Sequence, residues 1–213
     1  MLNRLIEFLR YRNRKIYQFS PVRSGSTLVF NLLQDLFPNH KIIKCHKIEP
    51  DLANRFPVVS TYRNPLDTLA STFQALDLEL NDGLLKTQAE KHKSRGLDNL
   101  LEIWGNPNVL KLQYESFYKD FDLIFDAFES FFSMRIGEAT RKTLSQKYHI
   151  EKVEKEASKF KDFKAFDKAT HWHGKHISEQ KGAIGYHVSY FTEEQAAFLQ
   201  KEFRPYLEKL GYL

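Results

Sequence analysis

The sequence predicts an α/β fold: a single three-layer domain with a central parallel sheet and a phosphate-binding loop after the first strand. Short β-branched runs alternate along the chain with longer segments of helical periodicity, the order typical of parallel sheets covered on both faces. The first run leads into a tight loop of small residues, R-S-G-S-T, and a helical segment follows. The 213 residues and 42% apolar content allow one well-buried core.

The first half of the chain alternates strands with helices. Residues 15–20 predict the first strand, and residues 27–37 predict the helix that follows the loop. The β-branched runs at 41–46 and 57–63 predict two more buried strands. Pro65 stands where a helix can begin, and one face of that helix carries Leu66, Leu69, Ala70 and Phe73.

The second half repeats the alternation. Residues 84–104 predict a helix that ends at N-P-N, and residues 109–114 predict a fourth strand. An aromatic stripe at helical spacing then predicts a helix packed on the core, although such a stripe also suits a substrate pocket. Its members are Phe117, Phe121, Ile124, Phe125, Phe128 and Phe132.

The two ends and the lysine-rich part complete a single domain over 1–213. Residues 1–14 predict a helix docked on its own domain, and a membrane-surface helix is the alternative. We expect 137–176 to be helical with a solvated face, and mobile near the active site. Thr192 and Gln195 form a capping box, and Gly211 ends the last helix.

Composition limits the function. No apolar run approaches the ~20 residues that span a bilayer, so we expect no transmembrane segment. The single cysteine excludes an internal disulfide and favours a cytoplasmic location. A net charge of +5 favours anionic ligands. Because the common nucleic-acid signatures are missing from the sequence, we expect a small anionic ligand and no nucleic acid.

The loop after the first strand has the composition of an anion cradle. Ser24, Gly25 and Ser26 have small side chains, so their backbone N–H groups can approach an anion closely. The helix that begins near Thr27 adds the positive end of its dipole, and Arg23 adds a permanent charge. A plain strand–helix turn is the structural alternative.

A second cation follows another strand. Arg63 ends a predicted buried strand, and Ser71 lies two turns into the next helix. Ligands of such sheets bind beyond the carboxyl ends of the strands, where Arg63 stands. The alternative is a salt bridge from Arg63 to Asp67.

Together, R-S-G-S-T after one strand and R-N-P-x-D-x-x-x-S after another resemble the sulfotransferase family. Those enzymes move a sulfuryl group from 3′-phosphoadenosine 5′-phosphosulfate (PAPS) to an acceptor hydroxyl or amine, leaving adenosine 3′,5′-bisphosphate (PAP). The resemblance implies that loop residues 23–27 hold the 5′-phosphosulfate. It also implies that Arg63 and Ser71 hold the 3′-phosphate.

Three further segments resemble the family in the same order. "KCH" is similar to its Lys-x-His element, and "LQYESF" is similar to a segment whose tyrosine, here Tyr114, borders the adenine. In "EQKGAIGYHVS", Lys181 and Gly182 match a segment that closes over the 3′-phosphate, whereas Gln180 replaces an arginine. The resemblance covers roughly residues 17–73, 109–132 and 175–213.

The catalytic residues implied are His46, Lys44 and Arg23. Lys44 and His46 are two apart on a strand and share a face, whereas Cys45 points to the other face, which argues against a Cys45–His46 nucleophilic pair. The resemblance implies that His46 is the general base. Lys44 and Arg23 would neutralise charge on the leaving oxygen, so no metal is required.

Some positions depart from the family pattern. Leu28 stands where many cytosolic members place a tryptophan against the adenine, and Arg23 replaces their lysine, as it does in carbohydrate- and protein-tyrosine-directed members. The acceptor classes that we expect are a small molecule, a glycan or a peptide.

Two other functions and a metal site are alternatives to consider. A kinase or nucleotide hydrolase needs Gly-Lys-Ser/Thr in its loop, and this order is missing here. A nucleotide-binding module without catalysis is a rival of a different class. "HWHGKH" holds His171, His173 and His176, but their spacing matches no common metal-ligand pattern, so we expect no metal.

Overall fold

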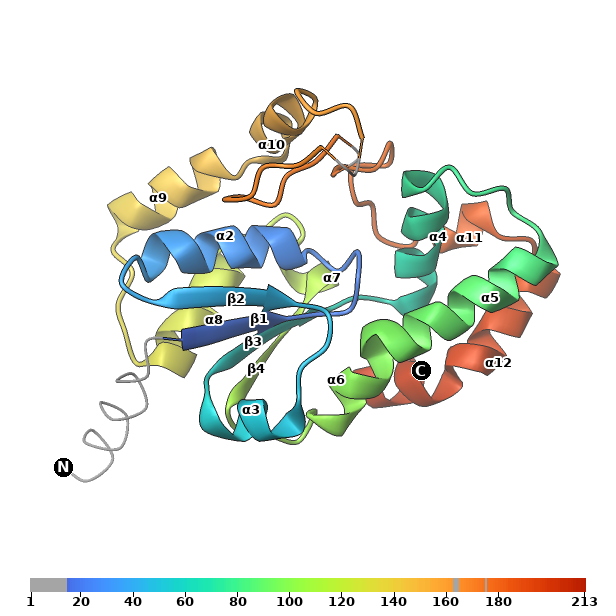
Figure 1. The fold of residues 1–213 in the computed structure, drawn as a ribbon, viewed down its shortest axis with the longest axis horizontal. Helices are drawn as coiled ribbons and strands as arrows, with labels where there is room; N and C mark the ends of the chain where they lie inside the picture. Colours follow the sequence, from blue (N-terminus) through green and yellow to red (C-terminus); the bar gives the residue numbers. More distant parts are fainter. Residues whose placement is uncertain (1–14, 163–164, 175) are drawn as a thin grey trace.

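The computed structural model describes residues 15–162, 165–174 and 176–213, so the helix predicted over 1–14 lies outside the described residues. The described strands form a sheet in the order β2-β1-β3-β4, and each neighbouring pair is parallel, as Figure 1 shows. The predicted parallel sheet is confirmed. Each strand ends one residue before its predicted end: β1 Lys15–Phe19, β2 Lys41–Cys45, β3 Val58–Tyr62 and β4 Val109–Gln113.

Helices connect and cover these strands. The short helices α3, α7 and α11 were not predicted from periodicity, because a helix of four to six residues is too short to display one. The helices are α2 Ser26–Leu36, α3 Pro50–Arg55, α4 Pro65–Ala75, α5 Asp82–His92, α6 Asp98–Glu102, α7 Tyr114–Phe117, α8 Asp122–Phe132, α9 Glu138–Lys147, α10 Ile150–Ala157, α11 His187–Tyr190 and α12 Glu193–Leu210.

The sheet is the middle layer of three. On one face, Phe19 and Val58 pack against side chains of α4, α5, α6 and α12. On the other face, Ile16 and Val59 pack against α2, α8 and α9. Successive strand side chains point to opposite faces, so one short strand supplies both cores. The three-layer α/β architecture is therefore confirmed.

The helix predicted over 84–104 is broken, and this prediction was wrong. It begins at Asp82 after the cap Asn81 and is interrupted at Arg95 and Gly96, within Lys93–Leu97 between α5 and α6. Gly96 has a φ of +143°, and a Cβ there would lie 2.8 Å from Cα of Pro21. The break brings the chain against Pro21, two residues before the R-S-G-S-T motif, a tertiary contact that periodicity does not encode.

The last helix begins and ends as predicted. The side chain of Thr192 accepts a hydrogen bond from the backbone N–H of Gln195, and the side chain of Gln195 accepts one from the backbone N–H of Thr192. Gly211 closes the helix with a φ of +80°. Within the part of the chain that the structure describes, no helix is long and apolar enough to cross a bilayer.

Candidate active site

The loop after β1 is held in a strained, fixed shape. Arg23 has a φ of +61° and Gly25 a φ of +83°, both in the left-handed region. The hydroxyl of Ser24 is buried and donates to the carbonyl O of Pro21 at 2.7 Å, and it lies 2.9 Å from Oγ1 of Thr61. The side chain of Ser24 thus fixes the loop to β3, and the whole residue is buried.

The two cation motifs meet in space. Nε of Arg23 donates to Oγ of Ser71 at 3.0 Å, so the loop after β1 touches the second turn of α4. Burial, reinforced by the nearby Arg63, lowers the pKa of Arg23 to about 10, so the guanidinium stays charged at neutral pH. The structure therefore places the predicted 5′ and 3′ ends of one nucleotide site side by side.

Arg63 leaves β3 into a crowded pocket. Its Nη2 donates to the carbonyl O of Ala183 at 2.6 Å and lies 3.6 Å from Oδ2 of Asp67. Its guanidinium lies 4.5 Å from the ring centre of Tyr114. The Asp67 salt bridge considered as an alternative is thus present. Nε of Arg63 is buried and has no hydrogen-bond partner among the described residues.

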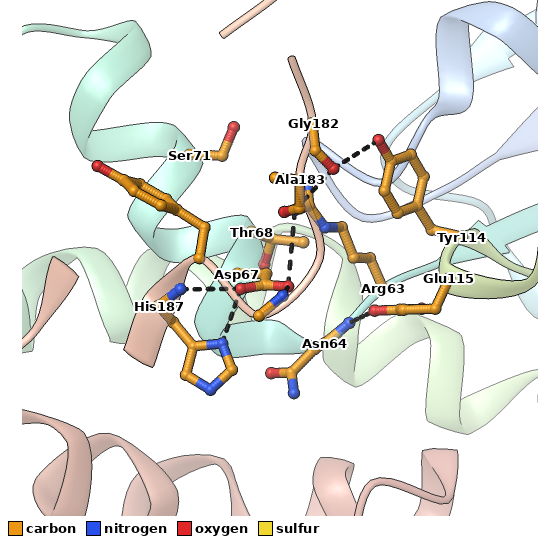
Figure 2. Close-up of polar contacts among 12 residues, drawn as sticks. Arg63, Asn64, Asp67, Thr68, Ser71, Tyr114, Glu115, Gly182, Ala183 and His187 are labelled. Atoms are coloured by element: carbon orange, nitrogen blue, oxygen red, sulfur yellow. Dashed lines mark hydrogen bonds and ion pairs between the residues drawn. The ribbon is translucent and has the colours of Figure 1, made fainter. Parts of the chain in front are cut away.

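Asp67 anchors the segment that closes the site (Figure 2). Its carboxylate accepts from the backbone N–H of Gly185 at 2.8 Å, the backbone N–H of His187 at 3.0 Å and Nδ1 of His187 at 2.7 Å. Burial alone would raise the pKa of Asp67, but the bonds from His187 and Gly185 outweigh it and hold that pKa below its usual value. Asp67 is therefore ionised and ties residues 185–187 to α4.

Tyrosines hold the same segment from the other side. The hydroxyl of Tyr114 donates to the carbonyl O of Gly182 at 2.9 Å, and that of Tyr118 donates to the carbonyl O of Lys181 at 3.0 Å. Burial raises the pKa of Tyr114, which keeps this donor protonated. The ammonium of Lys181 pairs with Glu154 of α10 at 3.0 Å. We call residues 181–187 the closing segment.

Lys44 and His46 line the opposite wall. Nζ of Lys44 donates to Oγ1 of Thr27 at 2.5 Å, and burial lowers the pKa of Lys44 to about 8. Nδ1 of His46 lies 2.7 Å from the carbonyl O of Ser20. Because a carbonyl only accepts, Nδ1 carries the proton and Nε2 is left as a free base.

His46 is set up to accept a proton near neutral pH. Partial burial of the ring lowers the pKa of His46, Lys44 lowers it further, and the bond to Ser20 opposes both. The residue as a whole is exposed, so an acceptor can reach Nε2. Cys45 packs against the core cluster that contains Phe19 and Val58, and burial raises the pKa of its thiol to about 11. The predicted divergence of Cys45 from His46 is therefore observed.

These residues surround one cavity of about 300 Å³. Arg23, Lys44, Arg63 and Lys181 line it, and no carboxylate lies among its described lining residues. Asp67 and Glu154 pair with Arg63 and Lys181, whereas Arg23 and Lys44 have no carboxylate partner among the described residues. Cations that are close together and not neutralised repel one another and favour an anionic ligand. Every predicted site residue except Ser24 lines this cavity: Arg23, Gly25, Ser26, Thr27, Lys44, His46, Arg63, Ser71, Tyr114, Lys181 and Gly182.

Some lining residues were missed by the sequence prediction. Phe117 and Phe121, from the aromatic stripe, line the cavity and also pack with the core, whereas Phe125 and Phe128 belong to the core without lining the cavity. Both interpretations of the stripe thus apply, and Phe117 fits both. Other lining residues come from segments without a recognisable motif: Tyr118, Tyr148, Ile150, Val153, Trp172, His173, His176, Ile177 and Ser178. No group of three metal-ligating side chains occurs among the residues described.

No protein-family model matches this chain, and no curated protein matches its sequence. Solved structures do match. Retinol dehydratase in complex with androsterone and the inactive cofactor PAP gives a TM-score of 0.70 at 16% identity, covering 93% of this chain and 83% of that chain.

Two more solved structures agree. Mouse sulfotransferase SULT7A1 complexed with PAP gives a TM-score of 0.69 at 17% identity, covering 92% of this chain and 85% of that chain. Retinol dehydratase in a complex with retinol and PAP gives 0.70 at 16% identity, covering 92% and 81%. The chain therefore has the sulfotransferase fold, as its motifs predicted.

Proposed function

We propose that this chain is a sulfotransferase that moves a sulfuryl group from PAPS to an acceptor hydroxyl or amine. The observation that carries the proposal is the bond from Arg23 to Ser71, which joins both phosphate motifs in one cavity next to a free imidazole nitrogen. The fold shared with PAP-bound structures supports the same conclusion.

The residues fit a doubly phosphorylated nucleotide. In this proposal Arg63 and Ser71 hold the 3′-phosphate, together with Lys181 and the backbone of Gly182. The unpartnered Nε of Arg63 supports this, because a buried guanidinium donor needs an acceptor. Tyr114 borders the adenine. The 5′-phosphosulfate is held by Arg23, Lys44 and the backbone N–H groups of Gly25, Ser26 and Thr27, whereas the buried Ser24, predicted as a further contact, holds the loop in shape.

In this proposal one base and two cations catalyse the transfer. PAPS supplies the sulfuryl group and a phosphate leaving group. Nε2 of His46 takes the proton of the acceptor hydroxyl, and Nδ1 keeps its bond to Ser20 throughout. A positioned base of this kind contributes ~10²–10⁴-fold in rate. Lys44 and Arg23 neutralise the charge that develops on the leaving oxygen. No metal is needed.

We propose the acceptor only by its chemical class, together with a cellular compartment. A small molecule, a glycan and a peptide were expected from the sequence. Two of the solved structures that share the fold are complexes with androsterone or with retinol, which supports a small molecule. The single cysteine, Cys45, supports the predicted cytoplasmic location.

Binding measurements separate this proposal from its first rival. We expect PAP to bind without Mg²⁺ and more tightly than ATP–Mg²⁺, measured by calorimetry in the presence and absence of chelator. Tighter binding of ATP–Mg²⁺ would favour the kinase or hydrolase.

Transfer measurements separate it from a module without catalysis. Labelled sulfate from PAPS is offered to a panel of hydroxyl and amine acceptors, and we expect transfer by the wild type. His46→Gln should lose at least ~10²-fold in rate and keep its affinity for PAP. Cys45→Ala, the matched neighbour that faces the other side, should keep most of its activity. Intact PAP binding without transfer to any acceptor would favour the module.

A further inference from the structure

Two histidines that the proposed mechanism does not use face the cations of the phosphosulfate end. His173 and His176 line the cavity with Arg23 and Lys44, and their ring centres lie 4.9 Å apart. Arg23 and Lys44 come from the loop after β1 and from β2, so the histidines line the same cavity from a third segment.

The segment that carries these histidines is fixed to the fold. Nδ2 of Asn31, on α2, donates to the carbonyl O of Thr170 at 2.9 Å. The ring centre of His171 lies 4.8 Å from that of Phe30, also on α2. An isolated antiparallel β-bridge pairs the backbones of Phe166 and His173 and restricts the conformation of the segment further. The position of His173 relative to the cations is therefore set by contacts on both sides.

The surroundings of the pair favour an anion. Burial, reinforced by Arg23 and Lys44, lowers the pKa of His173 to about 4. Burial, then His173, Arg23 and Lys44, lowers the pKa of His176 well below its usual value. Nδ1 of His176 is buried and has no hydrogen-bond partner among the described residues. A buried polar atom needs a hydrogen-bond partner, and the influence of Arg23 and Lys44 on this histidine favours an anionic one.

We propose that His173 and His176 bind the sulfonate end of the donor nucleotide, facing Arg23 and Lys44. The inference rests on the proposed sulfotransferase function and adds two residues to its donor site. Burial and the nearby cations together keep the histidines neutral, and an anion between the imidazoles and the cations offsets the part that is due to the cations. Binding should therefore take up protons, and affinity should rise as the pH falls.

Adenosine 5′-phosphosulfate is the probe for this end. It has no phosphate monoester, whose second pKa near 6 would otherwise contribute protons of its own. Calorimetry in buffers of different ionisation enthalpy gives its affinity and the protons taken up. Lys44 and His46 also face this end, but they are the same in every variant compared, so differences in uptake report the mutated histidines.

We compare the wild type, the double variant His173→Gln/His176→Gln and the control His171→Gln, which changes a histidine of the same segment that does not line the cavity. At pH 6.5 the double variant should bind adenosine 5′-phosphosulfate at least ~10-fold more weakly and take up fewer protons. The control should keep the wild-type affinity. Its proton uptake should differ from the wild type by no more than the share of His171 itself, whose pKa is lowered by burial and also by Lys44 and His46.

Adenosine 3′-monophosphate tests the Arg63 end and the fold. A double variant that binds both nucleotides as the wild type does, with unchanged proton uptake, overturns the inference and leaves the sulfotransferase proposal standing. A wild type that binds neither nucleotide overturns that proposal itself. If the double variant also loses adenosine 3′-monophosphate, His176→Gln alone decides, and proton uptake equal to the wild type counts against the inference.

Discussion

His46 illustrates how one hydrogen bond decides the chemistry of a residue. The carbonyl O of Ser20 accepts from Nδ1 and so fixes the tautomer with Nε2 free. The sequence predicted that His46 would share a face with Lys44, because that follows from strand periodicity. It did not predict the Ser20 partner, which depends on how the ends of β1 and β2 lie together.

The pH dependence of kcat/KM follows from the free-enzyme pKa values of His46 and Lys44. His46 must be neutral and its pKa is lowered, so the acid limb should lie below pH 6.5. Lys44 must be charged and its pKa is about 8, so activity should fall above about pH 8. Lys44→Arg should move only the alkaline limb upward, since arginine stays charged. An alkaline limb that stays in place would assign it to another group.

Arg63 should matter for one end of the nucleotide only. Arg63→Gln removes a charge but keeps a hydrogen-bonding side chain, and we expect affinity for PAP to fall by about one to two orders of magnitude. Affinity for adenosine 5′-phosphosulfate, which lacks the 3′-phosphate, should change much less. Equal losses for both ligands would show that Arg63 acts through the structure of the pocket.

At the scale of elements, the closing segment depends on a glycine without room for a side chain. Gly182 has a φ of +77°, and a Cβ there would lie 2.1 Å from the hydroxyl O of Tyr114. Gly185, three residues on, has a φ of +76° and open space around its Cβ position. Substituting alanine at each glycine therefore distinguishes the cost of backbone strain, which both positions share, from the displacement of Tyr114, which only Gly182 would cause.

Gly182→Ala and Gly185→Ala should therefore differ. Each should pay roughly 1–2 kcal/mol of unfolding free energy for a left-handed alanine. Gly182→Ala should additionally displace Tyr114 and weaken PAP binding by about tenfold or more, measured by urea unfolding and calorimetry. Equal PAP affinities in the two variants would contradict this role for the Gly182–Tyr114 contact.

Elements with a strong local pattern were predictable from sequence, and those fixed by tertiary contact were not. The strands and the capped helix α12 follow from residue type and spacing. The break at Gly96 follows from its approach to Pro21. His173 and His176 were recognised only as a poor metal pattern, because the packing of their segment on α2 leaves no periodic signal.

At the scale of the whole molecule, buried neutral histidines link stability to pH. His92 is the last residue of α5 and packs against α4, where its Nε2 lies 3.2 Å from Oγ1 of Thr72. Its Nδ1 donates to the carbonyl O of Gln88 at 3.0 Å. Burial lowers the pKa of His92 to about 4. Below pH 6.5 the unfolded chain binds a proton at this residue that the native protein does not, so stability falls with pH.

We expect the free energy of unfolding to drop by up to about 1.4 kcal/mol per pH unit for His92 between pH 6.5 and 4, with His173 adding to the slope. His92→Gln should be less stable at neutral pH and should lose its share of the slope in urea titrations. His149→Gln, at a side chain with 58% exposure, is the control. An unchanged slope in His92→Gln would exclude the buried histidine as its origin.

The position of β2 has a consequence for how such an enzyme diversifies. Among the described strands β2 has β1 as its one neighbour, and this outermost strand leads to His46, the proposed base. The groups assigned to the nucleotide come mainly from the interior strands and the late closing segment. In the proposed sulfotransferase, the edge strand β2 and its surroundings can therefore change to fit a new acceptor while the interior strands and the closing segment keep the same sulfuryl donor.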